Sequence, residues 1–393
     1  MSNNNKTPAI RFKGFTDTWE QRKLGEVADI VGGGTPSTSN DDYWDGDIDW
    51  YAPAEIADQI YVASSERKIT QQGYDNSSAK MLPVGTVLFT SRAGIGKTAI
   101  LRKEGCTNQG FQSIVPHINE LDSYFIFSRS EEMKRYGETV GAGSTFVEVS
   151  GKQMANMELM MPITMEEQVT IGSFFSNLDF LITLHQRKCD KLIQFKAAML
   201  KKMFPQNGAD KPEIRFKGFT DAWEQRKVQD VADRFDNLRI PVAANLRVHG
   251  TTPYYGANGI QDYVEGFTHD GEFVLVAEDG ANDLKNYPVK CVNGRIWVNN
   301  HAHVLQGKAG IADNSFLALA ISQSDIESLL VGGGRAKLNA EALMSIEFRL
   351  PCLQEQYRIG EYLTQLDNLI TLHQRKCDKY KSIKAGLIRK LFP

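Results

Sequence analysis

Few stretches of the sequence combine residue types and spacing that could support catalysis. Gly94–Thr98, GIGKT, ends like a phosphate-binding loop, but that motif needs glycine at the position of Ser91. An amino-methyltransferase would need an (Asn/Asp)-Pro-Pro-(Tyr/Phe) loop, and the sequence contains no Pro-Pro pair. Asp58, Glu66 and Lys68 have the loose spacing of a magnesium-dependent nuclease site. With 48 acidic residues in the chain such spacing is common by chance, so we predict no catalytic residue.

Histidines and cysteines do not form a metal-binding pattern. His301 and His303 would share one face of a strand, but no cysteine or acidic residue stands at ligand spacing beside them. The five cysteines are scattered without a CxxC pair, at Cys106, Cys189, Cys291, Cys352 and Cys377. We predict no metal site and no cofactor held by this chain.

Two internal repeats define the organisation of the chain. Ile10–Lys23, IRFKGFTDTWEQRK, returns as Ile214–Lys227 with one change in 14 positions. The sequence LITLHQRKCDK occurs at Leu181–Lys191 and again, without change, at Leu369–Lys379. We call the first repeat the head, the second the tail, and the residues between them the block. The blocks of the two halves differ in sequence, and the second block is 16 residues shorter. Two copies of the same repeats around different intervening sequences indicate two halves related by pseudo-two-fold symmetry that present different surfaces.

The tails have the composition of long helices. Between Glu166 and Phe204 the only helix breaker is Gly172, and good helix formers dominate. Apolar residues recur at heptad spacing in two rows, which predicts an antiparallel, coiled-coil-like pair of spacer helices. The predicted packing residues are Leu178, Leu181, Leu192 and Phe195 in the first tail and Leu366, Leu369, Tyr380 and Ile383 in the second. His185 and His373 interrupt one row; they would either lock the register or face solvent at its edge, and we favour the second interpretation.

The predicted fold class is α+β, with two mixed α/β domains separated by the two helices. At 393 residues the chain is too long for one core, and 41% hydrophobic residues suit compact domains. The expected boundaries are a first domain over 1–162 with a flexible tail at 1–9, a helix at 163–205, a linker at 206–213, a second domain at 214–351 and a helix at 352–393.

This arrangement resembles the specificity subunit of type I restriction–modification systems, with two target recognition domains and two spacer helices. In the first block the resemblance is carried by WEQRKLGEVADIVGGGTPS, LPVGTVLFTSRAGIGKTAI and CTNQGFQSIVP. In the second it is carried by YYGANGI at Tyr254–Ile260 and VNNHAHV at Val298–Val304. The resemblance covers almost the whole chain.

The resemblance implies a non-catalytic protein that reads a bipartite double-stranded DNA target. It implies two modification subunits that methylate adenine with S-adenosylmethionine, and two restriction subunits that use ATP and magnesium. No apolar run is long enough to span a membrane, so we expect a cytoplasmic protein. Two alternatives stay open: a self-contained nuclease or methyltransferase, and a coiled-coil scaffold without nucleic-acid function.

A net charge of −3 is unusual for a DNA-binding chain, but basic residues cluster. The stretches Lys80–Lys103 and Lys285–Ala312 each carry at least four Lys or Arg and no acidic residue. Arg, Asn and Gln read base edges, and Lys and Arg neutralise phosphates. The candidate DNA-binding residues are Arg92, Lys97, Asn108 and Gln109 in the first domain and Asn258, Arg295, Asn299, Asn300 and His303 in the second.

Overall fold

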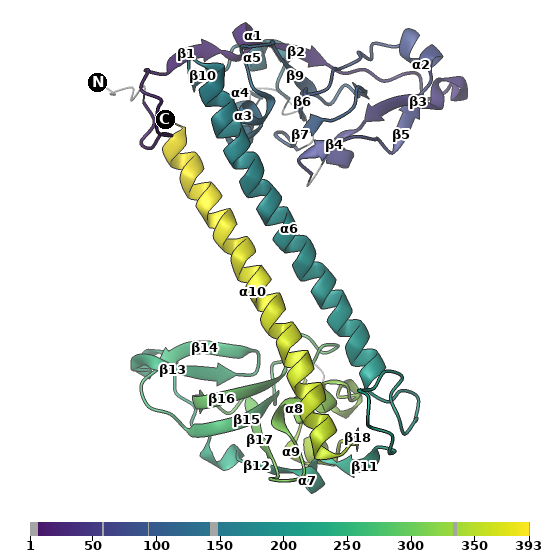
Figure 1. The fold of residues 1–393 in the computed structure, drawn as a ribbon, viewed down its shortest axis with the longest axis vertical. Helices are drawn as coiled ribbons and strands as arrows, with labels where there is room; N and C mark the ends of the chain where they lie inside the picture. Colours follow the sequence, from purple (N-terminus) through teal and green to yellow (C-terminus); the bar gives the residue numbers. More distant parts are fainter. Residues whose placement is uncertain (1–6, 57–58, 93, 142–147, 333–335, 393) are drawn as a thin grey trace. The chain divides into compact units, whose positions relative to one another are not determined.

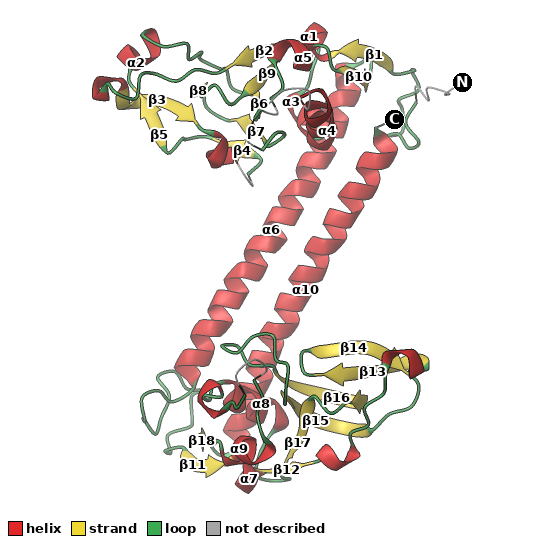
Figure 2. Cartoon of the chain, turned by 180° about the vertical axis from the view of Figure 1, so that it is seen from behind, coloured by secondary structure: helices red, strands yellow, loops and turns green. Residues whose placement is uncertain are grey.

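The structure is a computed structural model that describes residues 7–56, 59–92, 94–141, 148–332 and 336–392. Most of the predicted flexible tail, and Asp58 of the nuclease-like pattern, lie outside the described residues. The chain forms two compact units, Met1–His185 with Arg375–Pro393, and Gln186–Gln374. Each unit combines mixed sheets with part of two long helices (Figures 1 and 2), so the predicted α+β class is confirmed.

The first unit holds three sheets and short helices. A five-stranded sheet has the order β2 (Ala28–Gly32), β9 (Gln112–Pro116), β6 (Val87–Phe89), β7 (Thr98–Leu101), β4 (Tyr61–Val62). A three-stranded sheet has the order β5 (Arg67–Ile69), β3 (Trp44–Tyr51), β8 (Cys106–Thr107). The helices are α1 (Leu24–Val27), α2 (Gln71–Asp75), α3 (Ser123–Phe127), α4 (Ser130–Gly141) and α5 (Gly151–Ala155), with 3-10 turns at Asp41–Tyr43 and Pro53–Ile56.

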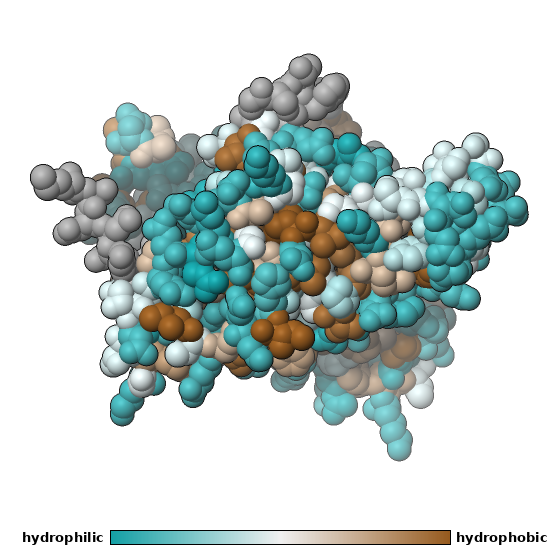
Figure 3. Space-filling model, turned by 90° about the horizontal axis from the view of Figure 1, so that it is seen from above, coloured by the Kyte–Doolittle hydropathy of each residue, from teal (hydrophilic) through white to brown (hydrophobic). Residues whose placement is uncertain are grey.

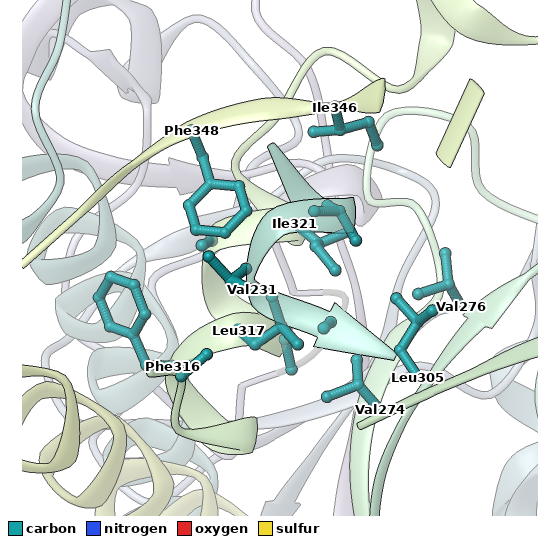
Figure 4. Close-up of a cluster of buried hydrophobic side chains, with 14 of the residues drawn as sticks. Val231, Val274, Val276, Leu305, Phe316, Leu317, Ile321, Ile346 and Phe348 are labelled. Atoms are coloured by element: carbon teal, nitrogen blue, oxygen red, sulfur yellow. The ribbon is translucent and has the colours of Figure 1, made fainter. Parts of the chain in front are cut away.

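The second unit is built around one six-stranded sheet. Its order is β12 (Ala232–Arg234), β17 (Ala302–Gly307), β15 (His269–Ala277), β16 (Val289–Val298), β13 (His249–Gly256), β14 (Gly259–Val264). The helices are α7 (Val228–Val231), α8 (Asn314–Ser322) and α9 (Ala340–Ser345), with 3-10 turns at Asp236–Leu238, Ala244–Leu246 and Glu327–Leu329. Val274, Val276 and Leu305 of the sheet pack against Phe316, Leu317 and Ile321 of α8 to form the buried core shown in Figure 4.

A two-stranded antiparallel sheet, here called the clasp, joins the two ends of each variable block. In the first unit β1 (Glu20–Lys23) pairs with β10 (Glu158–Met161), so that Lys23 faces Glu158. In the second, β11 (Glu224–Lys227) pairs with β18 (Glu347–Leu350) in the same register, with Lys227 facing Glu347. The chain therefore enters and leaves each block at neighbouring points.

The two blocks share a strand framework although their sequences differ. In the first unit β2 pairs with β9 through Ala28 and Pro116, and β6 pairs with β9 through Val87 and Ile114. In the second unit β12 pairs with β17 through Ala232 and Gly307, and β15 pairs with β17 through Val274 and Leu305. The order of these three strands and their antiparallel sense are the same, which makes β2, β9 and β6 the counterparts of β12, β17 and β15.

The tails form α6 (Met165–Met203) and α10 (Leu353–Leu391), each a single helix of 39 residues. In the first unit Asp179 accepts hydrogen bonds from Lys384 at 2.7 Å. In the second unit Lys196 donates to Asp367 at 2.6 Å, and the Cys189 thiol lies 3.9 Å from the carbonyl oxygen of Ile370. Within the second unit a later residue of α6 meets an earlier residue of α10, so these parts run antiparallel.

The packing rows of the helices differ in part from the prediction. Leu178 and Leu366 are buried, Leu192 is partly buried, and Tyr380 stacks on His185 with ring centroids 5.7 Å apart. His185, which we expected at the solvent edge, is buried.

The second predicted row, which holds Leu181 and Phe195 of α6 and Leu369 and Ile383 of α10, was placed one residue too early. Leu181 is only half-buried, and Phe195, Leu369 and Ile383 are 44%, 43% and 37% exposed. The row in contact holds Phe175, Cys189 and Met203 of α6 and Leu363, Cys377 and Leu391 of α10, with Lys196 and Lys384 at the same heptad position. A search for apolar residues passes over cysteine and lysine and so selects the neighbouring row.

This register predicts very different costs for two leucines of α10. Leu363→Ala should lower the free energy of unfolding by about 2–5 kcal/mol because it leaves a cavity in the core of the second unit. Leu369→Ala should cost below about 1 kcal/mol because that residue is 43% exposed and lies outside the buried row. Urea unfolding of both variants is the measurement, and equal losses would show that the rows are assigned wrongly.

The start of each long helix is fixed to its domain by matching polar contacts, here called the joint. In the first unit the Arg11 guanidinium donates to both carboxylate oxygens of Glu167 at 2.6 Å, and the backbone N–H of Asp122 donates to Gln168. In the second unit Arg215 donates to both oxygens of Glu355 at 2.7 and 2.8 Å, and the N–H of Asp313 donates to Gln356. Both glutamates are buried.

Close packing at the joint explains the glycine inside the first helix. A Cβ added to Gly172 would lie 2.4 Å from Oδ1 of Asp122, and one added to Gly360 would lie 2.8 Å from Oδ1 of Asp313. These carboxylates cap α3 and α8 by accepting from Phe125 and Phe316 N–H groups. A side chain at either glycine would push a half-buried carboxylate from the N–H group that it caps.

Gly172→Ala should therefore destabilise the protein by about 1–3 kcal/mol, the usual cost of overpacking. The matched control is Gly386→Ala, because Gly386 is also helical but has no atom within 4 Å of an added Cβ. That control should gain up to about 1 kcal/mol from helix propensity. Thermal unfolding of the two variants should shift the midpoint in opposite directions; a gain for Gly172→Ala would refute the packing argument.

Candidate nucleic-acid interface

Three loops of the first unit meet near the predicted residues Arg92, Asn108 and Gln109. The N–H of Gly34 donates to the carbonyl of Thr107 at 2.8 Å, and a Cβ on Gly33 would overlap the carbonyl oxygen of Asn108. Thr35 donates a hydrogen bond to the side-chain oxygen of Gln109. The glycines are needed because the two backbones approach too closely for a side chain.

Arg92 lies over the same loop. Its Nε would be 3.8 Å from a Cβ on Gly110, and residue 92 forms a bridge with Glu148 in the backbone. Within the described part of the chain, the Arg92 guanidinium has no ion-pair partner. Arg92, Asn108 and Gln109 are therefore brought together, as the DNA-binding prediction requires, around the exposed amide of Gln109.

Asn108 and Asn299 occupy the same place in the two frameworks. The Asn108 N–H donates to the Tyr51 carbonyl at 3.0 Å, and its side-chain oxygen accepts from the Gly110 N–H at 2.8 Å. The Asn299 N–H donates to the Tyr255 carbonyl at 3.1 Å, and its side-chain oxygen accepts from the His301 N–H at 2.8 Å. Each asparagine shapes a turn, and Asn299 is buried, so its side chain is structural and cannot contact a base as it stands.

His303, predicted to face DNA, is buried inside the second unit. Its Nδ1 lies 2.7 Å from the Asp236 carboxylate and its Nε2 lies 2.9 Å from the Leu338 carbonyl oxygen. Although burial alone would raise the pKa of Asp236, the hydrogen bond from His303 helps hold that pKa below its usual value. The DNA-facing prediction for His303 is wrong because both faces of β17 are covered at this point, where Ala302–Leu305 are all buried.

Asn258, Asn300 and Arg295 lie at the surface. Asn258 joins two loops, since it donates to the Gly280 carbonyl at 2.8 Å and accepts from the Asn282 N–H at 2.9 Å. Asn300 is exposed and directly follows Asn299. Arg295 on β16 pairs with Asp270 of β15 at 3.2 Å, and its guanidinium lies 4.8 Å from the centre of the Phe267 ring.

A hollow of about 190 Å³ opens beside the Asn258 loop. Its lining runs along Tyr255–Gly259, with Leu275, Ala277, Lys290 and Ala302. Strand register makes Ala302 the counterpart of Phe111, which is fully buried in the first unit. The corresponding position thus carries a small residue beside a hollow in the second unit and a buried aromatic residue in the first.

The basic stretches divide into structural and available cations. Lys103 donates to Asp49 at 2.7 Å and Lys68 donates to the same carboxylate at 2.6 Å. Lys308 donates to the carbonyls of Gln229 and Asp230. Across the residues that the structure covers, no ion pair is found for Lys97, Lys285 or Lys290, and these three are free to meet phosphates.

Other catalytic patterns do not assemble. Gly94–Thr98 is the turn between β6 and β7, with Gly94 and Gly96 at positive φ, and a strand follows it where a phosphate loop needs a helix. His301 pairs with Asp279, an acidic partner that lies far away in sequence. Among the described residues no group of three or more His, Cys, Asp or Glu could hold a metal, and no helix is long and apolar enough to cross a membrane.

Sequence reasoning missed several residues of these surfaces. Thr35 and Asp279 act through long-range contacts that spacing does not reveal, although the glycine run before Thr35 indicated a crowded turn. Arg67 stacks 3.6 Å over the Trp44 ring on the three-stranded sheet.

The view in Figure 3 shows one face of the molecule as mostly hydrophilic, with its apolar residues in small separate groups.

The ion pairs of the buried Asp49 carboxylate predict that the folded protein loses stability in acid. Burial would raise its pKa, but hydrogen bonds from Lys103 and Lys68 hold the pKa far below the usual value. The stabilisation is thus fully present above about pH 4, where free Asp is ionised, and is lost as pH falls below that value. Asp49→Asn should be less stable than the unchanged protein at pH 7, and urea titrations should show this gap closing below about pH 4. A gap that is constant with pH would contradict the assignment.

Two α/β domains with one framework and different exposed side chains define a duplicated recognition protein. Comparison with known proteins identifies the family. The model of the type I restriction modification DNA specificity domain matches twice, at residues 16–194 and 220–381. The chain belongs to this family.

Individual relatives agree with the family match. A provisionally named type I restriction enzyme specificity subunit of Haemophilus influenzae is 44% identical over 146 residues, covering 37% of this chain and 38% of that protein. The MjaIX specificity subunit of Methanocaldococcus jannaschii is 34% identical over 189 residues, covering 47% and 44%. The aligned part thus spans less than half of these relatives. The crystal structure of the M. genitalium S subunit is 13% identical, covers 98% of this chain and 99% of that one, and has a TM-score of 0.70, which shows the shared fold.

Proposed function

We propose that the protein is the specificity subunit of a type I restriction–modification complex. In this role each domain reads one half of a bipartite DNA target, and the subunit directs methylation and cleavage by its partners. The observation that carries the proposal is the common framework with matched turns at Asn108 and Asn299, beside which the exposed residues differ. One scaffold that presents two surfaces is suited to two unlike half-sites.

The available cations fit this proposal. Positive charge comes from Arg92 and Lys97 between β6 and β7 in the first unit, and from Lys285 before β16 and Lys290 on β16 in the second. Such side chains neutralise phosphates and set the position of a domain on DNA, while amides and guanidinium groups read bases. The negative net charge of the chain predicts weak DNA binding by the isolated subunit and stronger binding in the complex.

Partner subunits are expected to carry the chemistry. We propose two modification subunits, which bind S-adenosylmethionine, and two restriction subunits, which bind ATP and magnesium, acting with this chain on cytoplasmic DNA. The outer faces of both helices carry apolar side chains at corresponding positions, Leu369 and Leu372 in α10 and half-buried Leu181 and Leu184 in α6. An apolar surface repeated in this way, more exposed in α10 than in α6, suits two copies of one partner.

Replacing Val228–Leu350 with the equivalent block of another family member tests the proposal. The exchanged protein, co-expressed with modification subunits, should methylate a target in which one half is new and the other unchanged. Genome-wide methylation mapping is the measurement. The matched control exchanges the first block between the same clasp positions and should change only the other half. A change in both halves after either exchange would refute independent reading.

A further inference from the structure

Gln109 and Asn300 occupy corresponding positions at the ends of the two frameworks. Each follows the asparagine that forms the matched turn, and each is exposed. The backbone on the far side of the turn is also held alike: Ser91 N–H donates to the Gly110 carbonyl at 2.8 Å, and Glu278 N–H donates to the His301 carbonyl at 2.9 Å. Both side-chain amides therefore project into solvent from the same point of a loop that backbone hydrogen bonds hold in place.

The contacts around each turn explain why it can position a side chain. The turn residue Asn108 or Asn299 bonds back to the carbonyl of Tyr51 or Tyr255 at the end of a strand. Neighbouring strands fix both sides of the loop, because residues 90 and 111 are paired in the first unit and residues 277 and 302 in the second. A side chain on such a loop loses little further freedom on binding, which favours selective contacts.

The neighbours of the two amides differ in charge. In the first unit the Arg92 side chain lies over Gly110, next to Gln109. In the second unit the counterpart of Arg92 is Asp279, since residues 92 and 148 are bridged in one unit and residues 279 and 337 in the other. Asp279 pairs with His301, next to Asn300. Gln109 thus lies beside a cation, whereas Asn300 lies beside a carboxylate–histidine pair.

We infer that Gln109 and Asn300 are corresponding specificity-determining residues, each reading one base pair in the half-site of its own domain. Their amides carry the donor and acceptor that match N7 and N6 of adenine in the major groove. The Thr35 hydroxyl, which donates to the Gln109 side-chain oxygen, fixes the orientation of that amide and leaves its N–H groups and the second lone pair of that oxygen for DNA. Next to Gln109, Arg92 supplies a guanidinium group, which can bind guanine. The inference rests on the proposed function.

The test uses the full subunit co-expressed with its modification subunits, and maps methylated sites across the host genome. Gln109→Ala should relax one position of one half-site, lowering discrimination there by about 5- to 150-fold, with the other half unchanged. Asn300→Ala should do the same in the other half-site. Gln109→Glu should shift the preferred base at its position toward cytosine, because a carboxylate accepts from the cytosine amino group.

Matched controls use exposed amides away from the turns. Gln72 on α2 and Asn293 on β16 are exposed in the first and second unit. Gln72→Ala and Asn293→Ala should leave the target unchanged, and thermal unfolding should show all five variants folded. Unchanged targets in both Gln109→Ala and Asn300→Ala, or a folded variant that loses methylation at every site, would overturn the inference. If the unsubstituted complex methylated no two-part sequence, the proposed function itself would fail, which is a distinct result.

Discussion

The buried arginine–glutamate pair at each joint is the contact on which the rest of the molecule depends. Glu167 and Glu355 are each the third residue of their helix, where an acidic side chain also interacts favourably with the helix dipole. Bidentate pairing with Arg11 and Arg215 satisfies charges that would be costly to bury alone. Because the arginine comes from the head and the glutamate from the helix, the pair fixes the direction in which each helix leaves its domain.

The joint also gives a reason why the heads are repeated so closely, and why a glutamate and a glycine recur at the helix starts, while the blocks between them diverge. Arg11, Glu167 and Gly172 must fit one another, and Arg215, Glu355 and Gly360 must fit in the same way. A change in one member leaves a buried charge or a clash. The blocks carry a looser constraint, since their strand framework needs only apolar residues at inward positions, as the core around Val274 and Leu305 shows.

The sequence alone predicted the duplicated α+β organisation, the two long helices and the first packing row, because repeats and heptad spacing are local signals. It did not predict the second row, where Cys189, Lys196 and Lys384 take positions that a pattern of apolar residues cannot mark. The shared framework was also hidden, because strand pairing is set by contacts distant in sequence. At the candidate site, residue type singled out Asn108, Gln109, Asn299 and Asn300, but the sequence could not tell which amides are buried. His303 was misplaced for the same reason.

The clasp separates the length of a recognition block from the geometry of the helices. Its strands hold the entry and exit of each block in one register, Lys23 beside Glu158 and Lys227 beside Glu347, although the second block is 16 residues shorter. Insertions and deletions between these points are closed off as a loop and do not reach the helix start. A block of different length can therefore stand between the two clasp strands without compensating substitutions at the joint or in the helices.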